Sequence, residues 1–353
     1  MDVAPPFWRG KRVLVTGHTG FKGAWLCLWL HAMGAHVEGL APGPPTDPSL
    51  FALARVGDVV KSHPVDVRDH LAVERVVAEA GPEVVVHMAA QAVVRRSFAD
   101  PRETYETNVM GTVNVLEAVR KVPGVRVVVN VTSDKCYENR EWEWGYREDE
   151  PMGGHDPYSN SKGCSELVTS AFRRSFFDDG VRRTHLASAR AGNVIGGGDW
   201  GEDRLVPDIM RAALDESPIE IRHPEAIRPW QHVLNPLSGY LVLAQALWES
   251  PAHATGFNFG PPEEDAQPVR FIVERLSDRW PEPLDWRIDS RPHPHEARYL
   301  KLDSSRAHLR LGWAARWGLQ EAMDAIVDWY LALRSGSDMR TVTLSQVDAF
   351  AGA

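Results

Sequence analysis

The sequence predicts an α/β protein in which a doubly wound parallel sheet is joined to a smaller C-terminal domain. Three features of the 353 residues lead to this prediction. In the first half, apolar strand-like runs alternate with helix-like segments at the spacing of βαβ units. The first of these runs ends in a glycine-rich turn. After about residue 190 the pattern becomes irregular and prolines recur, which fits a smaller, lid-like domain.

The first unit of the chain is predicted as strand, glycine loop and helix. Residues 12–16 form a buried-strand pattern, and residues 24–33 have helical character with Gly34 as the stop. Glycines at 17, 20 and 23 permit a tight turn, close approach of a pyrophosphate and packing of the helix on the sheet. We therefore expect a Rossmann-type fold with a dinucleotide at this loop. The expected cofactor contacts here are Gly17, Thr19, Gly20, Phe21, Lys22 and Gly23.

The second predicted strand, residues 35–40, should end beside the adenine ribose of that cofactor. An acidic residue normally follows this strand and holds the two ribose hydroxyls, whereas an arginine there accommodates a 2′-phosphate. Residues 41–46 contain neither. We expect NAD as the cofactor, although the residues of this turn do not themselves distinguish NAD from NADP.

Two further segments are placed at the cofactor by the predicted order of strands. Asp66 and Val67 follow a short apolar run and should meet the adenine, and a buried strand within residues 83–91 runs into the small Ala89 and Ala90. Small residues let a cofactor lie flat against the backbone, although an ordinary loop is the alternative for each segment. Asn108 is a further expected cofactor contact, and Gln91 is expected to contact the substrate.

Catalytic side chains are predicted after the strand at residues 125–131. Its carboxyl end delivers Ser133, Asp134 and Lys135 to the crevice where such sheets bind ligands. Farther on, Tyr158 and Lys162 are separated by three residues, so on a helix they share one face. An ammonium beside a phenol lowers the tyrosine pKa from its ordinary value of about 10, which prepares the phenol to act as a base.

Length, charge and cysteine content limit the classes of protein to which this chain can belong. We expect residues 1–190 to form the cofactor domain and residues 191–353 mainly a substrate domain, with segments near 230–255 returning to the first. The formal net charge of −9 disfavours nucleic acid as a partner. Neither a membrane segment nor a leader peptide is expected. Three cysteines without metal spacing, Cys27, Cys136 and Cys164, indicate a reducing cytoplasm.

The predicted substrate domain contains cations on an otherwise acidic chain. Arginine forms bidentate bonds with phosphate, so a few arginines here suit a diphosphate-containing substrate, although each one alone is also an ordinary surface residue. His293 and His295 alternate with proline and no second cluster completes a metal site, so no catalytic metal is expected. The expected substrate contacts beyond Gln91 are Asn193, Arg204, Arg228 and Arg298.

Five sequence blocks closely resemble the extended short-chain dehydrogenase/reductase family, and within it the CDP-glucose 4,6-dehydratases. The glycine loop is specific only to the superfamily, whereas the Ser-Asp-Lys block and the Gly-Gly-Gly-Asp-Trp loop are more specific. The blocks span nearly the whole chain: residues 15–23, 130–139, 154–163, 191–200 and 228–233.

This resemblance implies loss of water through an internal redox cycle. Bound NAD takes hydride from sugar C4, water leaves across C5 and C6, and the hydride returns to C6. Residue by residue, the resemblance implies that Ser133 hydrogen-bonds the 4-hydroxyl and that Tyr158 deprotonates it. Lys162 would bind the nicotinamide ribose and lower the tyrosine pKa. Asp134 would protonate the departing 6-hydroxyl.

Lys135 departs from the related dTDP-glucose dehydratases, which carry a glutamate that takes the C5 proton. Lys135 replaces that base only if its pKa lies well below about 10.4, and the adjacent Asp134 opposes this. The resemblance also implies a homodimer formed by helices around residues 104–121 and 158–172. The alternative is that their apolar faces only cover the sheet.

Two other functions remain open at this point. A nucleotide-sugar 4-epimerase would share Ser133, Tyr158 and Lys162, but it has no need of an acid to expel the 6-hydroxyl. A non-catalytic dinucleotide-sensing protein uses the same fold. Asp134 therefore discriminates between the dehydratase and the epimerase.

Overall fold

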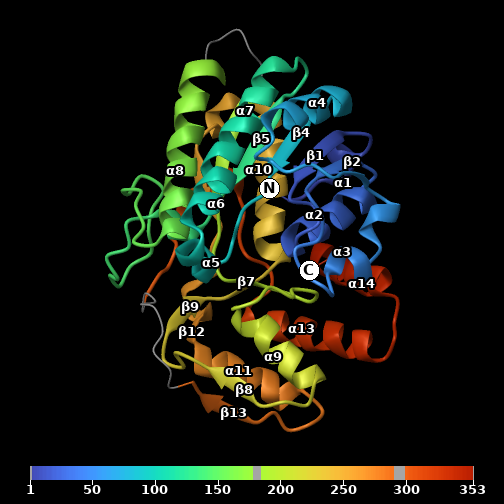
Figure 1. Ribbon diagram of the computed structural model, residues 1–353, viewed down its shortest axis with the longest axis vertical. Coiled ribbons are helices and arrows are strands. Elements are labelled where there is room, and N and C mark those ends of the chain that lie inside the picture. Colours follow the sequence, from blue (N-terminus) through green and yellow to red (C-terminus); the bar gives the residue numbers. More distant parts are fainter. Residues whose placement is uncertain (1, 178–183, 290–298, 353) are drawn as a thin grey trace.

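A seven-stranded parallel sheet forms the centre of the protein in the computed structural model, which describes residues 2–177, 184–289 and 299–352 (Figure 1). The strand order is β11-β6-β5-β4-β1-β2-β3. The predicted doubly wound parallel sheet is confirmed. The strands are β1 Arg12–Thr16, β2 His36–Leu40, β3 Lys61–His63, β4 Val84–His87, β5 Val127–Val131, β6 His185–Arg190 and β11 Gly256–Asn258.

The order of strands reverses between β1 and β4. From β1 the chain proceeds outward to β3 and then returns to form β4 on the other side of β1. Thr16 at the end of β1 pairs with His87 at the end of β4. Such a reversal opens a crevice beyond the carboxyl ends of the strands, where α/β sheets bind ligands. The glycine loop after β1 and the segment after β5 both lead into this region.

Helices cover both faces of the sheet, and two apolar cores result. Val13 and Val15 belong to one core and Leu14 to the other, because successive side chains of a strand point to opposite faces. The first core includes α2 and α10, and the second includes α4 and α7. The covering helices are α1 Pro5–Trp8, α2 Phe21–Ala32, α3 Leu50–Leu53, α4 His70–Ala80, α5 Val94–Ala99, α6 Pro101–Tyr105, α7 Gly111–Lys121, α8 Pro157–Phe172 and α10 Leu234–Glu249.

Helix α2, which follows the glycine loop, begins earlier than predicted. The helix starts at Phe21 rather than Ala24, and its first turn is therefore part of the glycine motif. Gly17 has a φ of +72°, and a Cβ there would lie 2.8 Å from the backbone nitrogen of Ala89. A Cβ at Gly23 would lie 2.2 Å from the carbonyl oxygen of Gly17. These two glycines allow the loop, the β4 end and the helix to pack closely together.

A second layer of smaller elements lies beside the carboxyl edge of the sheet (Figure 1). Two short β pairs, β8 with β13 and β9 with β12, stand next to helices α9 and α11. Apart from α10 and β11, the helices and strands that follow β6 are β7 Val194–Ile195, α9 Leu205–Leu214, β8 Ile219–Ile221, β9 Ile227–Pro229, β10 Gln231–His232, β12 Ala266–Pro268, α11 Val269–Arg279, β13 Trp286–Ile288, α12 Ser305–Leu311, α13 Leu319–Arg334 and α14 Met339–Gly352.

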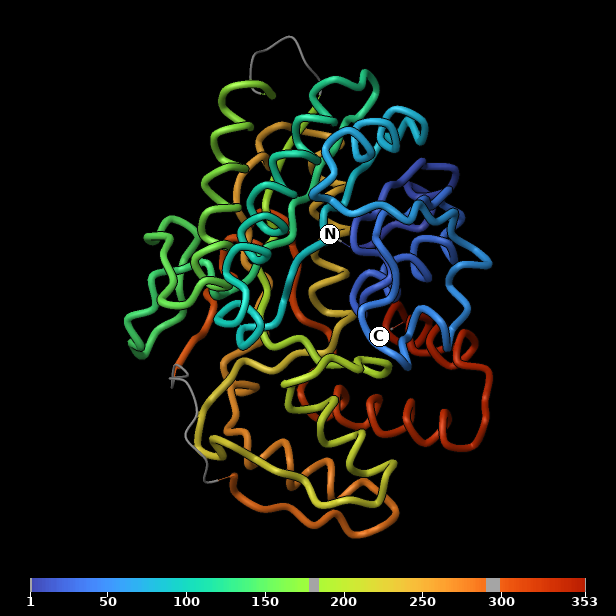
Figure 2. Tube along the Cα trace, in the orientation of Figure 1, coloured from blue at the N-terminus to red at the C-terminus, as the bar shows by residue number. Residues whose placement is uncertain are grey.

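The chain crosses between the two layers more than once. Strand β11 joins the main sheet, α10 packs against β5 and β6, and the C-terminal α14 packs against α2 (Figure 2). A single boundary at residue 190 therefore stays a prediction. Among the described helices, none combines the length and apolar character required to cross a bilayer. Short 3₁₀ and π segments complete the fold: η1 Val56–Asp58, η2 Glu106–Met110, η3 Asp134–Cys136, η4 Arg173–Phe177, η5 Pro251–His253 and η6 Glu263–Asp265.

Candidate active site

Strand β5 presents Ser133 and Asp134 at the carboxyl edge of the sheet. Ser133 caps the short η3 helix: its Oγ accepts a hydrogen bond from the Lys135 backbone nitrogen at 3.2 Å. The same hydroxyl donates to Asp134 Oδ1 at 2.9 Å. Both side chains are buried, with 6% and 1% of their surface exposed. The cap thus fixes an acid and a hydroxyl side by side.

The carboxyl group of Asp134 is suited to hold a proton. Burial raises its pKa, while the charges of Lys135 and Arg228 and the hydrogen bond from Ser133 oppose that rise. Its Oδ2 atom is buried and has no hydrogen-bond partner. A carboxyl group in this setting is prepared to donate a proton to a ligand placed beside it.

Room for that carboxyl group is provided by Gly192, which follows β6. A Cβ at this position would lie 1.8 Å from Asp134 Oδ2. Sequence reasoning used Gly192 only as part of a resembling block and missed its contact with Asp134. The contact joins two segments almost sixty residues apart, so nothing local in the sequence indicates it.

We predict that Gly192→Ala lowers kcat by about a hundredfold, because displacing a catalytic group by about 1 Å has effects of that size. Gly318→Ala is the matched control: the Cβ added there would meet the flexible Glu321 side chain at 3.0 Å instead of a catalytic carboxyl. Steady-state kinetics with circular dichroism as a folding check measures the effect. Full activity of a folded Gly192→Ala enzyme would contradict this role.

Tyr158 and Lys162 lie one turn apart on α8, as predicted. Asp156 caps this helix by accepting a hydrogen bond from the Ser159 backbone nitrogen at 2.9 Å. The exposed fractions of Tyr158 and Lys162 are 8% and 6%. The Lys135 ammonium lies 6.0 Å from the centre of the Tyr158 ring. The structure therefore brings the five predicted catalytic residues together at the ends of β5 and α8.

The pKa of Tyr158 differs from the sequence-based expectation. Burial raises it to about 12, and the groups that lower it are the side-chain hydrogen bond of Ser133 and the charge of Arg204. The expected lowering of this pKa by Lys162 is not among the main effects. Burial also lowers the pKa of Lys162 itself to about 8. Desolvation by burial is the largest effect on the pKa of both groups.

Arg204 is paired with Asp199 and interacts electrostatically with Tyr158. Its Nη1 pairs with Asp199 Oδ2 at 3.0 Å, and the other oxygen of Asp199 accepts the Gly201 backbone nitrogen. The Asp199 charge raises the pKa of Arg204, and the Arg204 charge acts on Tyr158. Through Asp199, the Gly-Gly-Gly-Asp-Trp loop at residues 196–200 therefore holds the Arg204 guanidinium where its charge acts on Tyr158.

Lys22 and Tyr240 form a second amine–phenol pair near the cluster. Lys22 Nζ donates to the Tyr240 hydroxyl at 2.8 Å. Burial, together with the charges of Lys162 and Arg204, lowers the pKa of Lys22 to about 7. Burial raises the pKa of Tyr240, and Asp134 and Tyr158 act in the same direction. Sequence reasoning missed Tyr240, whose only signal is a phenol within an apolar helix.

The remaining predicted cofactor contacts surround the glycine loop. Thr19 Oγ1 donates to the Gly43 carbonyl oxygen at 2.7 Å, which ties the loop to the turn after β2. The Ala89 backbone nitrogen donates to Thr16 Oγ1 at 3.1 Å, so Ala89 lies directly against the loop. Gly20 begins α2 without a side-chain cap. Free amides at this helix end suit a phosphate.

Three other predicted contacts use their polar atoms within the protein. Asp66 accepts hydrogen bonds from the backbone nitrogen and guanidinium of Arg68, which lower its pKa. Asn108, in the π segment η2, bonds both backbone groups of Gln91. The Gln91 side chain in turn bonds Val93 and Thr104. Asn108 and Gln91 therefore fix the loop after β4, and their direct ligand contacts stay predictions.

The predicted substrate contacts are distributed around the second layer. Asn193, directly after Gly192, has a φ of +47°. The positive charge of Arg228 opposes the rise in the pKa of Asp134. Val67, a predicted cofactor contact, is buried against Gly111. Arg298, His293 and His295 lie outside the described residues.

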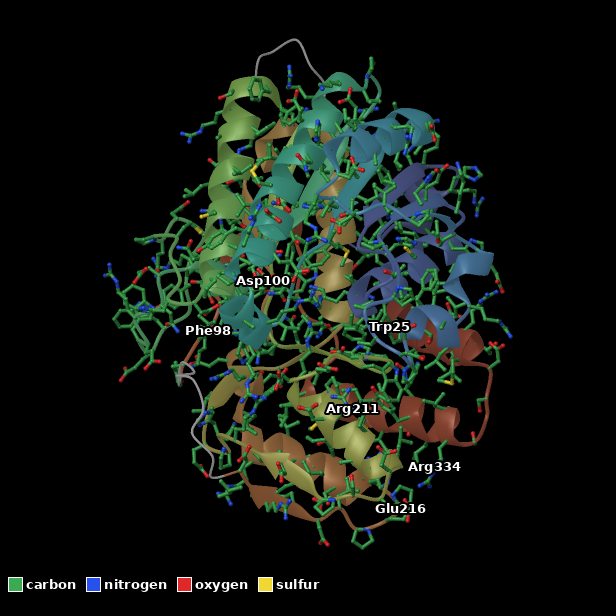
Figure 3. The ribbon with its side chains drawn as sticks, viewed as in Figure 1. Trp25, Phe98, Asp100, Arg211, Glu216 and Arg334 are labelled. Atoms are coloured by element: carbon green, nitrogen blue, oxygen red, sulfur yellow. The ribbon has the colours of Figure 1, made fainter. Side chains whose placement is uncertain are left out.

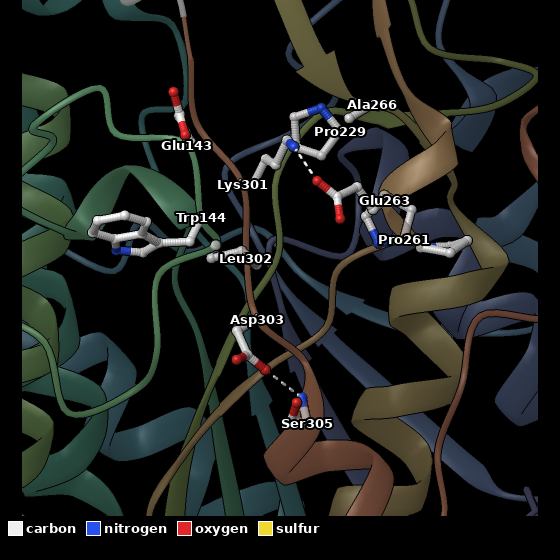
Figure 4. Close-up of a pocket in the computed structure, with 12 residues that line it drawn as sticks. Glu143, Trp144, Pro229, Pro261, Glu263, Ala266, Lys301, Leu302, Asp303 and Ser305 are labelled. Atoms are coloured by element: carbon white, nitrogen blue, oxygen red, sulfur yellow. Dashed lines mark hydrogen bonds and ion pairs between the residues drawn. The ribbon is translucent and has the colours of Figure 1, made fainter.

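A separate cavity of about 520 Å³ opens beside Trp144 (Figure 4). The Lys301 ammonium and Glu263 carboxylate pair at 2.6 Å on its wall. None of the five predicted catalytic residues is among the described residues of its lining, so this cavity is distinct from the cluster at β5 and α8. The described lining is Glu143, Trp144, Gly145, Pro229, Pro261, Pro262, Glu263, Ala266, Lys301, Leu302, Asp303 and Ser305.

Comparisons with known proteins give consistent results. Residues 14–326 match the GDP-mannose 4,6 dehydratase family. The chain is 56% identical over 351 residues to the CDP-glucose 4,6-dehydratase of Salmonella typhimurium, covering 98% of each chain. It is 29% identical over 328 residues to the dTDP-glucose 4,6-dehydratase of Mycolicibacterium smegmatis, covering 92% of this chain and 94% of the relative.

Two solved structures show the same arrangement of elements. The UDP-glucose 4-epimerase of Thermus thermophilus, solved with NAD, has a TM-score of 0.77 and 27% identity over 91% of this chain and 99% of its own. The dTDP-glucose 4,6-dehydratase of Streptomyces venezuelae, solved with NAD and TYD, has a TM-score of 0.78 and 23% identity over 93% and 99%. The second likeness concerns the fold alone.

Proposed function

The chain belongs to the GDP-mannose 4,6 dehydratase family, and from this premise we propose that it converts CDP-D-glucose to CDP-4-keto-6-deoxy-D-glucose with loss of water. The 56% identity to a CDP-glucose 4,6-dehydratase over nearly the whole chain supports the nucleotide and the reaction. The observation that carries the chemistry is the buried Asp134 carboxyl, whose Oδ2 is unpaired beside Ser133 and Tyr158.

The residues after β1 and β4 fit NAD. Gly17 turns with a positive φ, α2 begins without a side-chain cap, and Ala89 leaves the crevice wall free of bulk. These features suit a pyrophosphate and a flat ring system. When bound, NAD supplies the hydride acceptor that later returns the hydride. Lys162 would hold the adjoining ribose, and its position one turn from Tyr158 on α8 supports this role.

The side chains divide the proton transfers between them. Tyr158 removes the proton of the sugar 4-hydroxyl, which Ser133 orients, while hydride leaves C4. Asp134 protonates the departing 6-hydroxyl. We propose Lys135 as the base that takes the C5 proton and later returns it. Its place beside the Tyr158 ring supports this assignment. Arg204, held by Asp199, stabilises negative charge on Tyr158.

The test compares CDP-, dTDP-, GDP- and UDP-glucose with purified NAD-loaded protein. We expect CDP-glucose to yield a 4-keto-6-deoxy sugar, read by its alkaline ultraviolet absorbance, without net accumulation of reduced cofactor. Formation of an inverted sugar instead of this product would favour a 4-epimerase, to which the likeness with the Thermus structure also points. Tight NAD binding without any sugar turnover would leave only the dinucleotide-sensing alternative.

We also propose a homodimer formed by α5 to α8. These helices contact one another, and Tyr105 on α6 donates to Asn160 on α8 at 2.9 Å. Large apolar side chains stay exposed on them (Figure 3 labels Phe98). The most exposed are Phe98 at 52%, Met110 at 50% and Leu167 at 60%. An isologous interface suits apolar side chains left uncovered on neighbouring helices.

We predict that Leu167→Glu converts the dimer to a monomer, because a charge at an apolar interface loses its hydration without gaining a partner. Leu309→Glu on α12, where the wild-type side chain is 81% exposed, is the matched control and should stay dimeric. Light scattering after size-exclusion chromatography measures the mass. A monomeric wild type would contradict the interface.

We also propose that the protein acts in a reducing cytoplasm, which the free thiols of Cys27, Cys136 and Cys164 support.

A further inference from the structure

Helix α8 carries a third buried side chain on the side that bears Tyr158 and Lys162. Glu166 follows Lys162 by four residues, as Lys162 follows Tyr158, so each lies one turn from the next. At most 8% of the surface of any of the three is exposed. The proposed reaction uses Tyr158 and Lys162 and assigns no role to Glu166. A carboxyl group buried this deeply stays ionised only when other groups compensate its charge.

Arg190, the last residue of β6, holds the Glu166 carboxylate through two parallel hydrogen bonds. Arg190 Nε donates to Oε1 at 2.9 Å, and Nη2 donates to Oε2 at 2.8 Å. This bidentate geometry fixes the plane of the carboxylate. Burial acts to raise the pKa of Glu166, but the Arg190 charge and the hydrogen bonds from Arg190, Ser188 and Thr132 hold it below its usual value. Glu166 is therefore a fixed, ionised acceptor inside the protein.

Two buried hydroxyl groups also donate to this carboxylate, and they come from different segments. Thr132 Oγ1 donates to Glu166 Oε1 at 2.5 Å, and Ser188 Oγ donates to Oε2 at 2.6 Å. Ser188 lies within β6, two residues before Arg190. Thr132 follows β5 directly and immediately precedes Ser133. Of the two bonds, the one from Thr132 therefore joins α8 to the segment that carries the proposed catalytic hydroxyl and acid.

A second side chain of β5 contacts α8 farther from the site. Asn130 Nδ2 donates to Ser165 Oγ at 3.1 Å and to Thr169 Oγ1 at 2.6 Å. Asn130 and Thr132 are two residues apart, so both face the same side of the extended chain. The Asn130 contacts hold the body of the strand to the helix, and the Thr132 contact holds its catalytic end.

We propose that Glu166 is a positioning residue that fixes the catalytic end of β5 relative to the Tyr158 side of α8. Its carboxylate acts through the Thr132 hydroxyl, and Arg190 keeps that carboxylate in place. Oxidation at C4 needs the Ser133 hydroxyl after β5 and the Tyr158 phenol on α8 at the same time. A displacement of about 1 Å between catalytic groups slows such a step by as much as about a hundredfold. This role rests on the proposed dehydratase function.

The experiment removes one hydroxyl at a time and leaves the buried ion pair intact. Thr132→Ala and Ser188→Ala each delete one hydrogen bond to Glu166, whereas Thr132→Ser keeps the hydroxyl. The variants are assayed as full-length, NAD-loaded enzymes in excess over CDP-glucose, and the first formation of reduced cofactor is followed per bound NAD. Thr132→Ala should slow this C4 oxidation by about ten- to a hundredfold. Thr132→Ser and Ser188→Ala should stay close to the wild-type rate.

A purely structural role of Glu166 gives a different pattern. Thr132→Ala and Ser188→Ala would then lower the melting temperature alike and leave C4 oxidation per bound NAD unchanged, which would overturn the proposal. Equal slowing of both variants, or no rescue by Thr132→Ser, would also overturn it. Thr132→Val, which likewise lacks the hydroxyl, provides the same test if Thr132→Ala does not fold. Failure of the proposed function is distinct, because wild type itself would then form no ketosugar.

Discussion

Asp134→Asn should lower turnover of CDP-glucose by about 10²–10⁴-fold while reduced cofactor accumulates on the enzyme, because general acid catalysis contributes effects of this size. The amide keeps the shape of the carboxyl group but cannot release a proton to the 6-hydroxyl. Oxidation at C4 does not use the proton of Asp134, so the reaction should stop at the 4-ketone. The near-ultraviolet absorbance of reduced cofactor and the alkaline ketosugar assay together measure both half-reactions.

Asp265→Asn is a stringent control for this prediction. Asp265 is also buried, its Oδ2 also lacks a partner, and burial also raises its pKa. Its Oδ1 accepts the Leu319 backbone nitrogen at 3.1 Å, well outside the catalytic cluster. We expect this variant to retain normal turnover. If Asp134→Asn dehydrated the sugar at the wild-type rate, another group would be the acid.

The parallel sheet was predictable because several of its strands have a strong local signal. Strands β1, β4 and β5 are apolar runs, and β1 occupies the predicted residues 12–16, whereas β3, Lys61–His63, is short and polar. The start of α2 was placed three residues late, because Phe21, Lys22 and Gly23 were interpreted as loop. Their backbone is helical, and only the close packing of Gly23 on Gly17 shows how the helix begins there.

The proposed catalytic residues could be selected from the sequence, but the residues that support them could not. Ser133, Asp134, Tyr158 and Lys162 stand in short sequence patterns whose spacing has a chemical meaning. Tyr240 and Gly192 reach the site from distant segments, so their importance depends on tertiary contacts alone. The direction of the Tyr158 pKa shift also required the structure, because burial cannot be measured from the spacing of a tyrosine and a lysine.

Tyr158→Phe should also lower turnover by about 10²–10⁴-fold, since it removes the proposed base. Its signature differs from that of Asp134→Asn, because without removal of the 4-hydroxyl proton no hydride leaves C4 and no reduced cofactor accumulates. Tyr105→Phe is the matched control: Tyr105 donates to Asn160 on α8, outside the cluster. Rapid formation of reduced cofactor by Tyr158→Phe would show that another group takes this proton.

The pH dependence provides an independent test of the same base. Only the phenolate accepts a proton, and burial raises the Tyr158 pKa to about 12. Below this pKa the phenolate fraction increases with pH, so wild-type kcat/KM should rise through the neutral and alkaline range. Bound NAD brings a positive ring close to the phenol and should shift this rise to lower pH. Tyr158→Phe has no phenolate to form, so its residual kcat/KM should lose this rise, whereas Tyr105→Phe should retain it.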